Sequence, residues 1–339
     1  MMQLADLYDI FNVVVKIMED KTLWKYSDIR KKAWNSLTDG SPINAVLATF
    51  IYSLIISVPV TFIVTASTIF LFVSGGAFII ESESHQIDYS WFASTGFIVF
   101  ILSFLLILLL IVLFGIFVIA PLTVGYNRYL INMVRKSPDN GFGSIFYSFK
   151  KGRYLNQVAG MFAKDIRLAL NSVVFFVAIY VPWIIFYFVL PFLDSLGNSN
   201  NNLLLILFPM LLILIIFLLP ILANLWFIRC AYAYRFTEFI IAEYDGLKMN
   251  QAVNLSIKLA KGIKLRMVFL NLTFIGWYFL NYMTSGLLMY WITPYITTAF
   301  YKVYCIQKSN NPELFEGLTP FEYDKDILQS DGVEESVTI

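Results

Sequence analysis

One short polar segment carries the side chains that come nearest to a reactive or metal-binding set. The segment ESESHQID, residues 81–88, holds Glu81, Glu83 and the only histidine of the chain, His85. Carboxylates and an imidazole at alternate positions of an extended loop are ligands that a divalent cation accepts. A short loop between two apolar runs is also polar simply because water surrounds it. We favour the solvated loop and expect neither a metal nor a cofactor here.

Motifs for enzyme chemistry are missing from the rest of the sequence. It has no G-x-S-x-G, no P-loop, no H-E-x-x-H and no C-x-x-C. Catalysis by a nucleophile and a histidine would have to use His85. The two cysteines, Cys230 and Cys305, lie near basic ends of apolar runs, so we expect free thiols in a reducing compartment. The sequence therefore predicts a protein that is not an enzyme and has no catalytic residues.

A second set of polar residues lies within the apolar runs. Its members are the asparagines Asn171, Asn224, Asn271 and Asn281. In a helical bundle such amides usually make interhelical hydrogen bonds worth about 0.6 kcal/mol each. The same residues would also suit a polar track for a neutral or zwitterionic substrate. No ionisable side chain accompanies them, which argues against a proton-driven pump.

The elements that carry these residues are predicted to be membrane helices. The chain has 339 residues, of which 59% are hydrophobic and 14% charged, so it is too apolar for a soluble domain. Its net charge of +1 provides no general attraction to nucleic acid. Charge-free runs long enough to cross a bilayer predict an all-α bundle of six spans. The spans lie at about 44–73, 91–120, 168–193, 203–227, 263–281 and 286–304.

The positions of the cations predict how the chain is threaded. All 24 Lys and Arg residues fall in residues 1–43, 121–167, 228–266 and 302–339. An excess of cations marks cytoplasmic segments, so alternate connections and both termini are predicted to be cytoplasmic. The last two spans share one charge-free run, which NYMTSG (281–286) breaks with residues that favour a turn.

The chain divides into three predicted regions. Residues 1–25 have the spacing of an amphipathic helix, residues 26–305 form the membrane domain, and residues 306–339 form an acidic flexible tail. Ser41 and Pro42 suit the N-cap and first position of the first span. Candidates for contact with anionic lipid headgroups are the cations Lys150, Lys151, Arg153, Lys261 and Lys264.

Several segments resemble a bacterial integral-membrane family catalogued as domain of unknown function 975. The segment FIGWYFLNYMTSGLLMYWITPYITTAFYKVY (274–304) resembles its closing signature. AVNLSIKLAKG (252–262), FYSFKKGRY (146–154) and PLTVGYNRYLINMVR (121–135) resemble earlier segments. The resemblance covers about residues 26–305 and implies a Gram-positive origin. The family is also similar to the membrane portion of some glycerophosphodiester phosphodiesterases, which is not their catalytic part.

These observations favour a non-enzymatic accessory or scaffold protein of the cell envelope, in the plasma membrane. An immunity-type partner in a peptide-export or antimicrobial system belongs to the same class. The alternative is a transporter or lipid-handling protein for a neutral or zwitterionic substrate. The expected partners are membrane lipids at the inner face and another membrane protein, and no nucleic acid.

Overall fold

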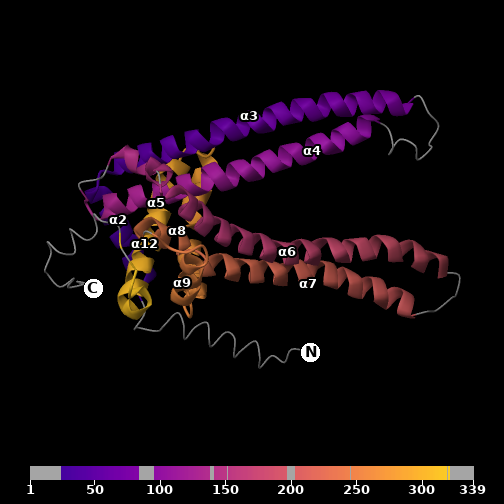
Figure 1. Ribbon diagram of the computed structural model, residues 1–339. Helices are drawn as coiled ribbons and strands as arrows, with labels where there is room; N and C mark the ends of the chain where they lie inside the picture. Colours follow the sequence, from indigo (N-terminus) through magenta and orange to yellow (C-terminus); the bar gives the residue numbers. More distant parts are fainter. Residues whose placement is uncertain are drawn as a thin grey trace.

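The computed structural model describes residues 24–83, 95–137, 141–150, 152–196, 203–244, 246–318 and 320. These residues form helices, with one isolated β-bridge between Tyr244 and Pro320. Two long helical hairpins extend in one general direction from a compact base of shorter helices (Figure 1). The all-α prediction is therefore confirmed for the described part of the chain.

The first hairpin consists of α3 (Pro42–Glu83) and α4 (Thr95–Phe114). Helix α3 begins at Pro42, and the Ser41 carbonyl accepts hydrogen bonds from the Asn44 and Ala45 amides, so the predicted start of this helix is confirmed. Helix α4 continues through a π-helical turn, η2 (Gly115–Ile119), into α5 (Ala120–Val134). The second helix of this hairpin thereby continues into the base.

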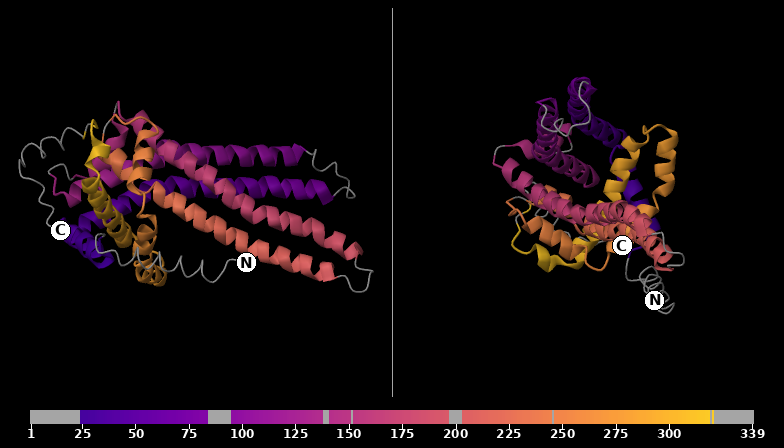
Figure 2. Two further views of the ribbon diagram at one scale, coloured as in Figure 1. Left: turned by 90° about the horizontal axis from the view of Figure 1, so that it is seen from below. Right: turned by 90° about the vertical axis from the view of Figure 1, so that its right-hand side faces the viewer.

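The second hairpin consists of α6 (Tyr154–Leu196) and α7 (Leu203–Ala233). It packs along its own length but diverges from the first hairpin away from the base (Figures 1 and 2). The described outer surfaces of both hairpins are apolar, as at Phe62, Leu105 and Phe188. Such faces are stable against lipid tails, which are as apolar as the side chains themselves.

Four described segments are long and apolar enough to cross a membrane: Pro42–Phe70, Ile98–Val134, Tyr154–Phe188 and Ile213–Glu243. They correspond to the first four predicted spans. A fifth candidate exists only if Gln251–Leu259 and Lys264–Met283, which are bent by 80°, are taken together. The count of six spans and the side of the membrane on which the termini lie remain predictions.

The base contains α2 (Tyr26–Asp39), α5, the 3₁₀ helix η3 (Phe142–Phe149), α8 (Thr237–Glu243) and α9 (Gln251–Leu259). Most of residues 121–167, which the sequence predicts as a connection, are helical in α5, η3 and the start of α6. The reason is an apolar face on α5 that includes Leu122, Tyr129 and Met133, all buried in the core. The long helices thus run on beyond their apolar segments into the base.

The last part of the chain forms α10 (Lys264–Leu272), α11 (Ile275–Met283), a turn at 284–288, and α12 (Met289–Asn310). The predicted break near NYMTSG is therefore present. Residues 306–310 continue α12, and η4 (Pro312–Phe315) packs against it. The first part of the predicted tail thus belongs to the base, and residues 321–339 lie outside the described residues. Residues 1–23 of the predicted N-terminal helix also lie outside them.

Candidate functional site: a buried ion network in the base

Helix α8, with the sequence TEFIIAE, carries two acids into the centre of the base. Hydrogen bonds at Ser256 of α9 fix the corner between α7 and α8: its hydroxyl donates to the Ala233 carbonyl (2.9 Å) and accepts from the Phe236 amide (3.1 Å). The apolar residues Phe239 and Ile240 of α8 are buried. This packing leaves Glu238 and Glu243 pointing at neighbouring helices instead of at water.

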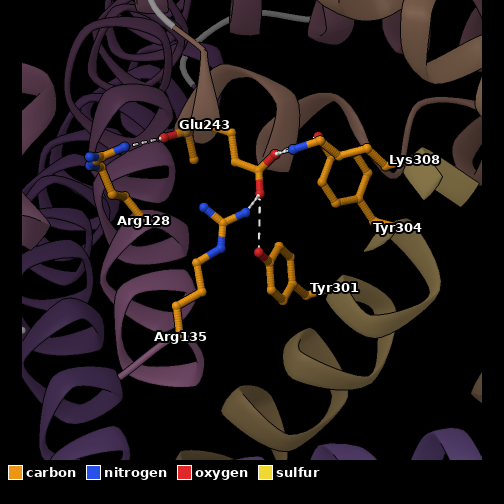
Figure 3. Close-up of polar contacts among 7 residues, drawn as sticks. Arg128, Arg135, Glu243, Tyr301, Tyr304 and Lys308 are labelled. Atoms are coloured by element: carbon orange, nitrogen blue, oxygen red, sulfur yellow. Dashed lines mark hydrogen bonds and ion pairs between the residues drawn. The ribbon is translucent and has the colours of Figure 1, made fainter. Parts of the chain in front are cut away.

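Glu243 binds side chains from two helices that are remote in sequence (Figure 3). Its side chain is 2% exposed and pairs with Arg135, the residue that caps the C-terminus of α5. On α12, Tyr301 donates to Oε1 (3.0 Å), while Tyr304 (2.8 Å) and Lys308 (3.0 Å) donate to Oε2. A carboxylate has about four acceptor positions, so these four donors saturate it. The network therefore holds α5, α8 and α12 together and leaves no free acceptor for a substrate.

Glu238 makes the equivalent connection to the second hairpin. It accepts a hydrogen bond from Lys164 of α6 (2.8 Å) and one from Asn127 of α5 (3.1 Å). Since α5 continues the first hairpin and α6 begins the second, this acid links the two hairpins at their roots. We call Glu238, Glu243 and their partners the ion network; its lysine and arginine members are Arg135, Lys164 and Lys308.

Arg128 lies beside the network and connects it to η3. Its guanidinium donates to the Ala242 carbonyl (2.8 Å) and lies 4.6 Å from the centre of the Tyr147 ring. Arg153 (4.8 Å) and Lys150 (5.4 Å) approach the same ring. Cations over an aromatic face are attracted by its quadrupole. Two of the predicted headgroup-binding cations thus lie against an aromatic ring of the base.

The other predicted headgroup cations are dispersed. Lys261 is exposed and Lys264 is half-buried at the start of α10. Lys151 lies outside the described residues. Whether any of these cations binds lipid remains a prediction.

The four asparagines do not form one continuous track through the hydrogen bonds that the structure describes. Asn171 of α6 accepts from Trp226 Nε1 (3.3 Å) and Cys230 Sγ (3.4 Å) on α7. Asn271 accepts from Tyr278 (3.4 Å), its neighbour on the next helix. Asn224 is exposed on α7 and Asn281 is half-buried on α11. The hydrogen bonds of Asn171 join α6 to α7. They are therefore of the interhelical kind expected of amides in a helical bundle.

The predicted cation loop lies largely outside the described residues. Glu81 and Glu83 belong to the end of α3, whereas His85 and Asp88 fall in the undescribed segment 84–94. Within the described part of the chain, no group of three histidines, cysteines or acids could hold a metal ion. The idea of a cation site at residues 81–88 therefore remains a prediction.

Sequence analysis missed the ion network because its members are far apart in the chain. Glu243 lies 108 residues from Arg135 and 58 from Tyr301. One signal was available: Tyr301, Tyr304 and Lys308 share a helical face, and the basic stretch 228–266 contains three acids, Glu238, Glu243 and Asp245. That pattern suggests pairing, but it does not identify the partners.

Cys305, next to the network on α12, provides a reporter of its integrity. Burial raises the pKa of the Cys305 thiol to about 11, and the nearby Glu243 carboxylate contributes to that rise. Since the thiolate is the reactive form, we expect the native protein at pH 8 to alkylate at Cys305 at least about 100-fold more slowly than the protein in denaturing detergent. Mass spectrometry of peptides after iodoacetamide pulses measures both rates. Equal rates in the two states would contradict the prediction.

Taken together, the described residues define an all-α protein with four helical segments that are long and apolar enough to span a membrane. Residues 113–310 match the family model described as "Protein of unknown function (DUF975)". Because the match covers more than half of the chain, the protein belongs to this family, as its sequence resemblance predicts. No curated protein and no solved structure matches the chain.

The matched region identifies which part of the fold the family shares. It begins at Leu113, near the end of α4, and ends at Asn310, the last residue of α12. It therefore contains every member of the ion network and the whole second hairpin. Helices α2 and α3 lie outside it. The further likeness to the membrane portion of glycerophosphodiester phosphodiesterases remains a prediction.

Proposed function

We propose that this protein is a non-enzymatic accessory protein of the cell envelope, which holds a partner membrane protein between or beside its two hairpins. The proposal rests on the distribution of charged residues between the hairpins and the base. Segments 42–80, 95–127, 168–193 and 203–228 of the hairpins contain no acid, lysine, arginine or histidine. At their roots, Glu238 pairs with Lys164, and Glu243 pairs with Arg135 and Lys308, in the ion network. Ion-coupled transporters place such groups at mid-membrane, because that charge drives the coupling.

The shape supports the same proposal. Each hairpin is a separate pair of helices, and the two pairs are joined through the base. Diverging hairpins leave long apolar faces available for lipid or for another transmembrane helix. A base clamped by buried ion pairs keeps the spacing between the two hairpins fixed. This is the geometry that a scaffold needs, since it presents two arms at a defined separation.

The proposed setting is the plasma membrane of a Gram-positive bacterium, with the base and both termini in the cytoplasm. The support is the confinement of all Lys and Arg residues to the stretches that form the base and the termini. The proposed partner is a membrane protein of a peptide-export or antimicrobial system, for which this chain would be an accessory or immunity factor.

Photo-crosslinking in living cells tests the proposal. A benzophenone amino acid replaces, one at a time, Leu54, Val58 and Phe62, which lie on one exposed face of α3. A partner helix on that face gives protein adducts of one fixed mass, because a seated helix contacts successive turns of the same face. Leu155, exposed on the base, is the matched control and should not give that adduct. Exposed apolar positions on α4 and α6, substituted in the same way, identify which hairpin contacts the partner.

The alternative, transport or handling of a neutral or zwitterionic substrate, is favoured by one observation. Among the described residues, no group forms a hydrogen bond with the buried side-chain oxygen of Asn281. A ligand with a donor group would satisfy it. Combined Asn171→Leu, Asn224→Leu, Asn271→Leu and Asn281→Leu substitutions separate the two functions. The accessory role predicts that the substituted protein still forms the α3 adduct. If that adduct is lost and the α3 positions crosslink only to lipid, the accessory role is overturned.

A further inference from the structure

Both limbs of the last hairpin contact one residue of the base. Trp277 of α11 stacks on Trp34 of α2 with ring centroids 6.4 Å apart, and Trp291 of α12 lies 5.8 Å from the same ring. Trp34 precedes the first membrane segment, which begins at Pro42. The chain therefore leaves the base after Trp277 and has returned to it by Trp291.

This spacing limits how far the hairpin can reach. The turn begins at Thr284. A helix rises 1.5 Å per residue, so the path from Trp277 to Thr284 covers about 10 Å. The hydrocarbon core of a bilayer is about 30 Å thick. Even if it stood upright, the hairpin would end about a third of the way across.

The hairpin also lies across the direction of the long helices. In Figure 1, α12 runs across the direction of α3, α4, α6 and α7. The right-hand view of Figure 2 looks along these long helices, and it shows α11 and the start of α12 from the side. Tyr290, just before Trp291, contacts Phe50 of α3 with ring centroids 5.3 Å apart. Phe50 lies about 12 Å along α3 from Pro42. The hairpin therefore sits beside the root of the first span.

Helix α9 cannot complete a crossing for this segment. It meets the segment Lys264–Met283 at 80° and buries Val253, Ser256 and Leu259 in the base. Its other face carries the exposed side chains of Gln251, Asn254 and Lys258. A polar face of this kind would be unstable in hydrocarbon. Among the described residues, α12 is not one of the helices apolar enough to cross.

The outer face of α10 and α11 is suited to the membrane surface. Exposed apolar residues recur at helical spacing along it: Leu265, Leu272, Ile275, Phe279 and Tyr282. On α10 the opposite face is buried at Met267 and Leu270, and Phe274 before α11 is buried too, whereas α11 itself has no buried residue. Lys261 and Lys264 stand at the beginning of the exposed face. An apolar face flanked by lysines is typical of a helix that lies in the plane of the lipid interface.

We propose that residues 264–291 form a lipid-binding anchor that lies in the bilayer leaflet nearest the base and does not cross the membrane. The occupant of its exposed face is lipid: acyl chains against the apolar residues and anionic headgroups against Lys261 and Lys264. The hairpin contacts α3 through Tyr290 of α12, which packs on the exposed Phe50, so it lies next to the lipid-facing surface of a spanning helix. The described part of the chain then has four spans, and its first and last residues, 24 and 320, lie on the same side.

Depth measurements on the full-length protein in vesicles of phosphatidylcholine and phosphatidylglycerol test this inference. In a background with Cys230→Ala and Cys305→Ala, nitroxide labels are attached to Ile275→Cys, Phe279→Cys and Tyr282→Cys. Power-saturation EPR with oxygen and a water-soluble nickel chelate reports the depth of each label. The matched control is Leu102→Cys, Leu106→Cys and Leu109→Cys on α4, which are exposed and have the same spacing.

On α4 the depth should change by about 10 Å over the seven residues, at 1.5 Å per residue. On the anchor the three labels should lie at one shallow depth and remain accessible to oxygen. A progression like that of α4 would overturn the inference, because the segment would then stand along the membrane normal instead of lying in the plane of one leaflet. Labels shielded from both reagents would also overturn it, since a second copy or another protein would then cover the face. Leu272 and Leu287, both exposed, serve as further labelling sites if one variant fails to fold.

Discussion

Replacing Glu243 by alanine is expected to lower the free energy of unfolding of the base by about 3–5 kcal/mol, the usual cost of breaking a buried ion pair by removing one partner. The substitution removes the acceptor for Arg135, Tyr301, Tyr304 and Lys308 together. The two tyrosine side chains are buried and cannot recover their hydrogen bonds from water. Equilibrium unfolding in mild detergent, followed by near-UV circular dichroism of the tyrosine-rich base, measures the effect.

The network also predicts an order among variants. Lys308→Ala should cost much less than Glu243→Ala, because the Lys308 side chain is 32% exposed and Glu243 would keep its other three donors. Glu243→Gln should fall between them, since the amide oxygen still accepts from one tyrosine but the charge is lost. Glu313→Ala, an exposed acid on η4, is the control and should be neutral. Equal losses for Glu243→Ala and Glu313→Ala would show that the network does not stabilise the fold.

The first four spans could be predicted because insertion into lipid acts on local composition. A run without charge, such as 89–127, is unstable in water and favourable in hydrocarbon whatever the rest of the chain does. The charge-free runs therefore located α3, α4, α6 and α7. They could not define where these helices end, because the continuation of α4 into α5 depends on packing against η3 and α8.

The base could not be derived in the same way. Glu243 and Arg135 look like ordinary members of basic, loop-like stretches, and their pairing depends on the tertiary fold. The asparagines illustrate the opposite situation. Asn224 stands out in the sequence as a polar residue within an apolar run, yet it is exposed on α7. A single polar residue marks a site only when the fold places other polar groups beside it.

In the last charge-free run, hydropathy cannot distinguish a helix in the plane of the membrane from one that crosses it. A helix lying in the plane of the interface and one crossing the membrane both need apolar residues, so composition along 267–301 does not separate them. The contacts of Trp277 and Trp291 with Trp34 supply the missing information, because they fix both ends of the hairpin to the base. This is a long-range contact that no local pattern encodes.

Gly125→Ala is expected to be among the most damaging single substitutions in the chain. Gly125 lies on α5 where that helix packs against η3, and a Cβ there would be 1.9 Å from the Ile145 carbonyl oxygen and 2.7 Å from its carbonyl carbon. These are backbone atoms, so no side-chain rotation relieves the clash, and Ile145 is itself fully buried. Alanine favours a helix over glycine by about 1 kcal/mol, which is too little to offset the overlap. We expect a net loss of about 3 kcal/mol in the free energy of unfolding.

The consequence should extend from η3 to the ion network. If η3 moves away from α5, Tyr147 leaves Arg128, whose guanidinium also binds the Ala242 carbonyl beside Glu243. Thermal unfolding in detergent and the alkylation rate of Cys305 should therefore change together in Gly125→Ala. Gly143→Ala is the matched control, because Gly143 lies in η3 itself and a Cβ there meets no atom within 4 Å. If both variants unfold like the parent, α5 and η3 are not in backbone contact, and the base must be held together mainly by its side chains.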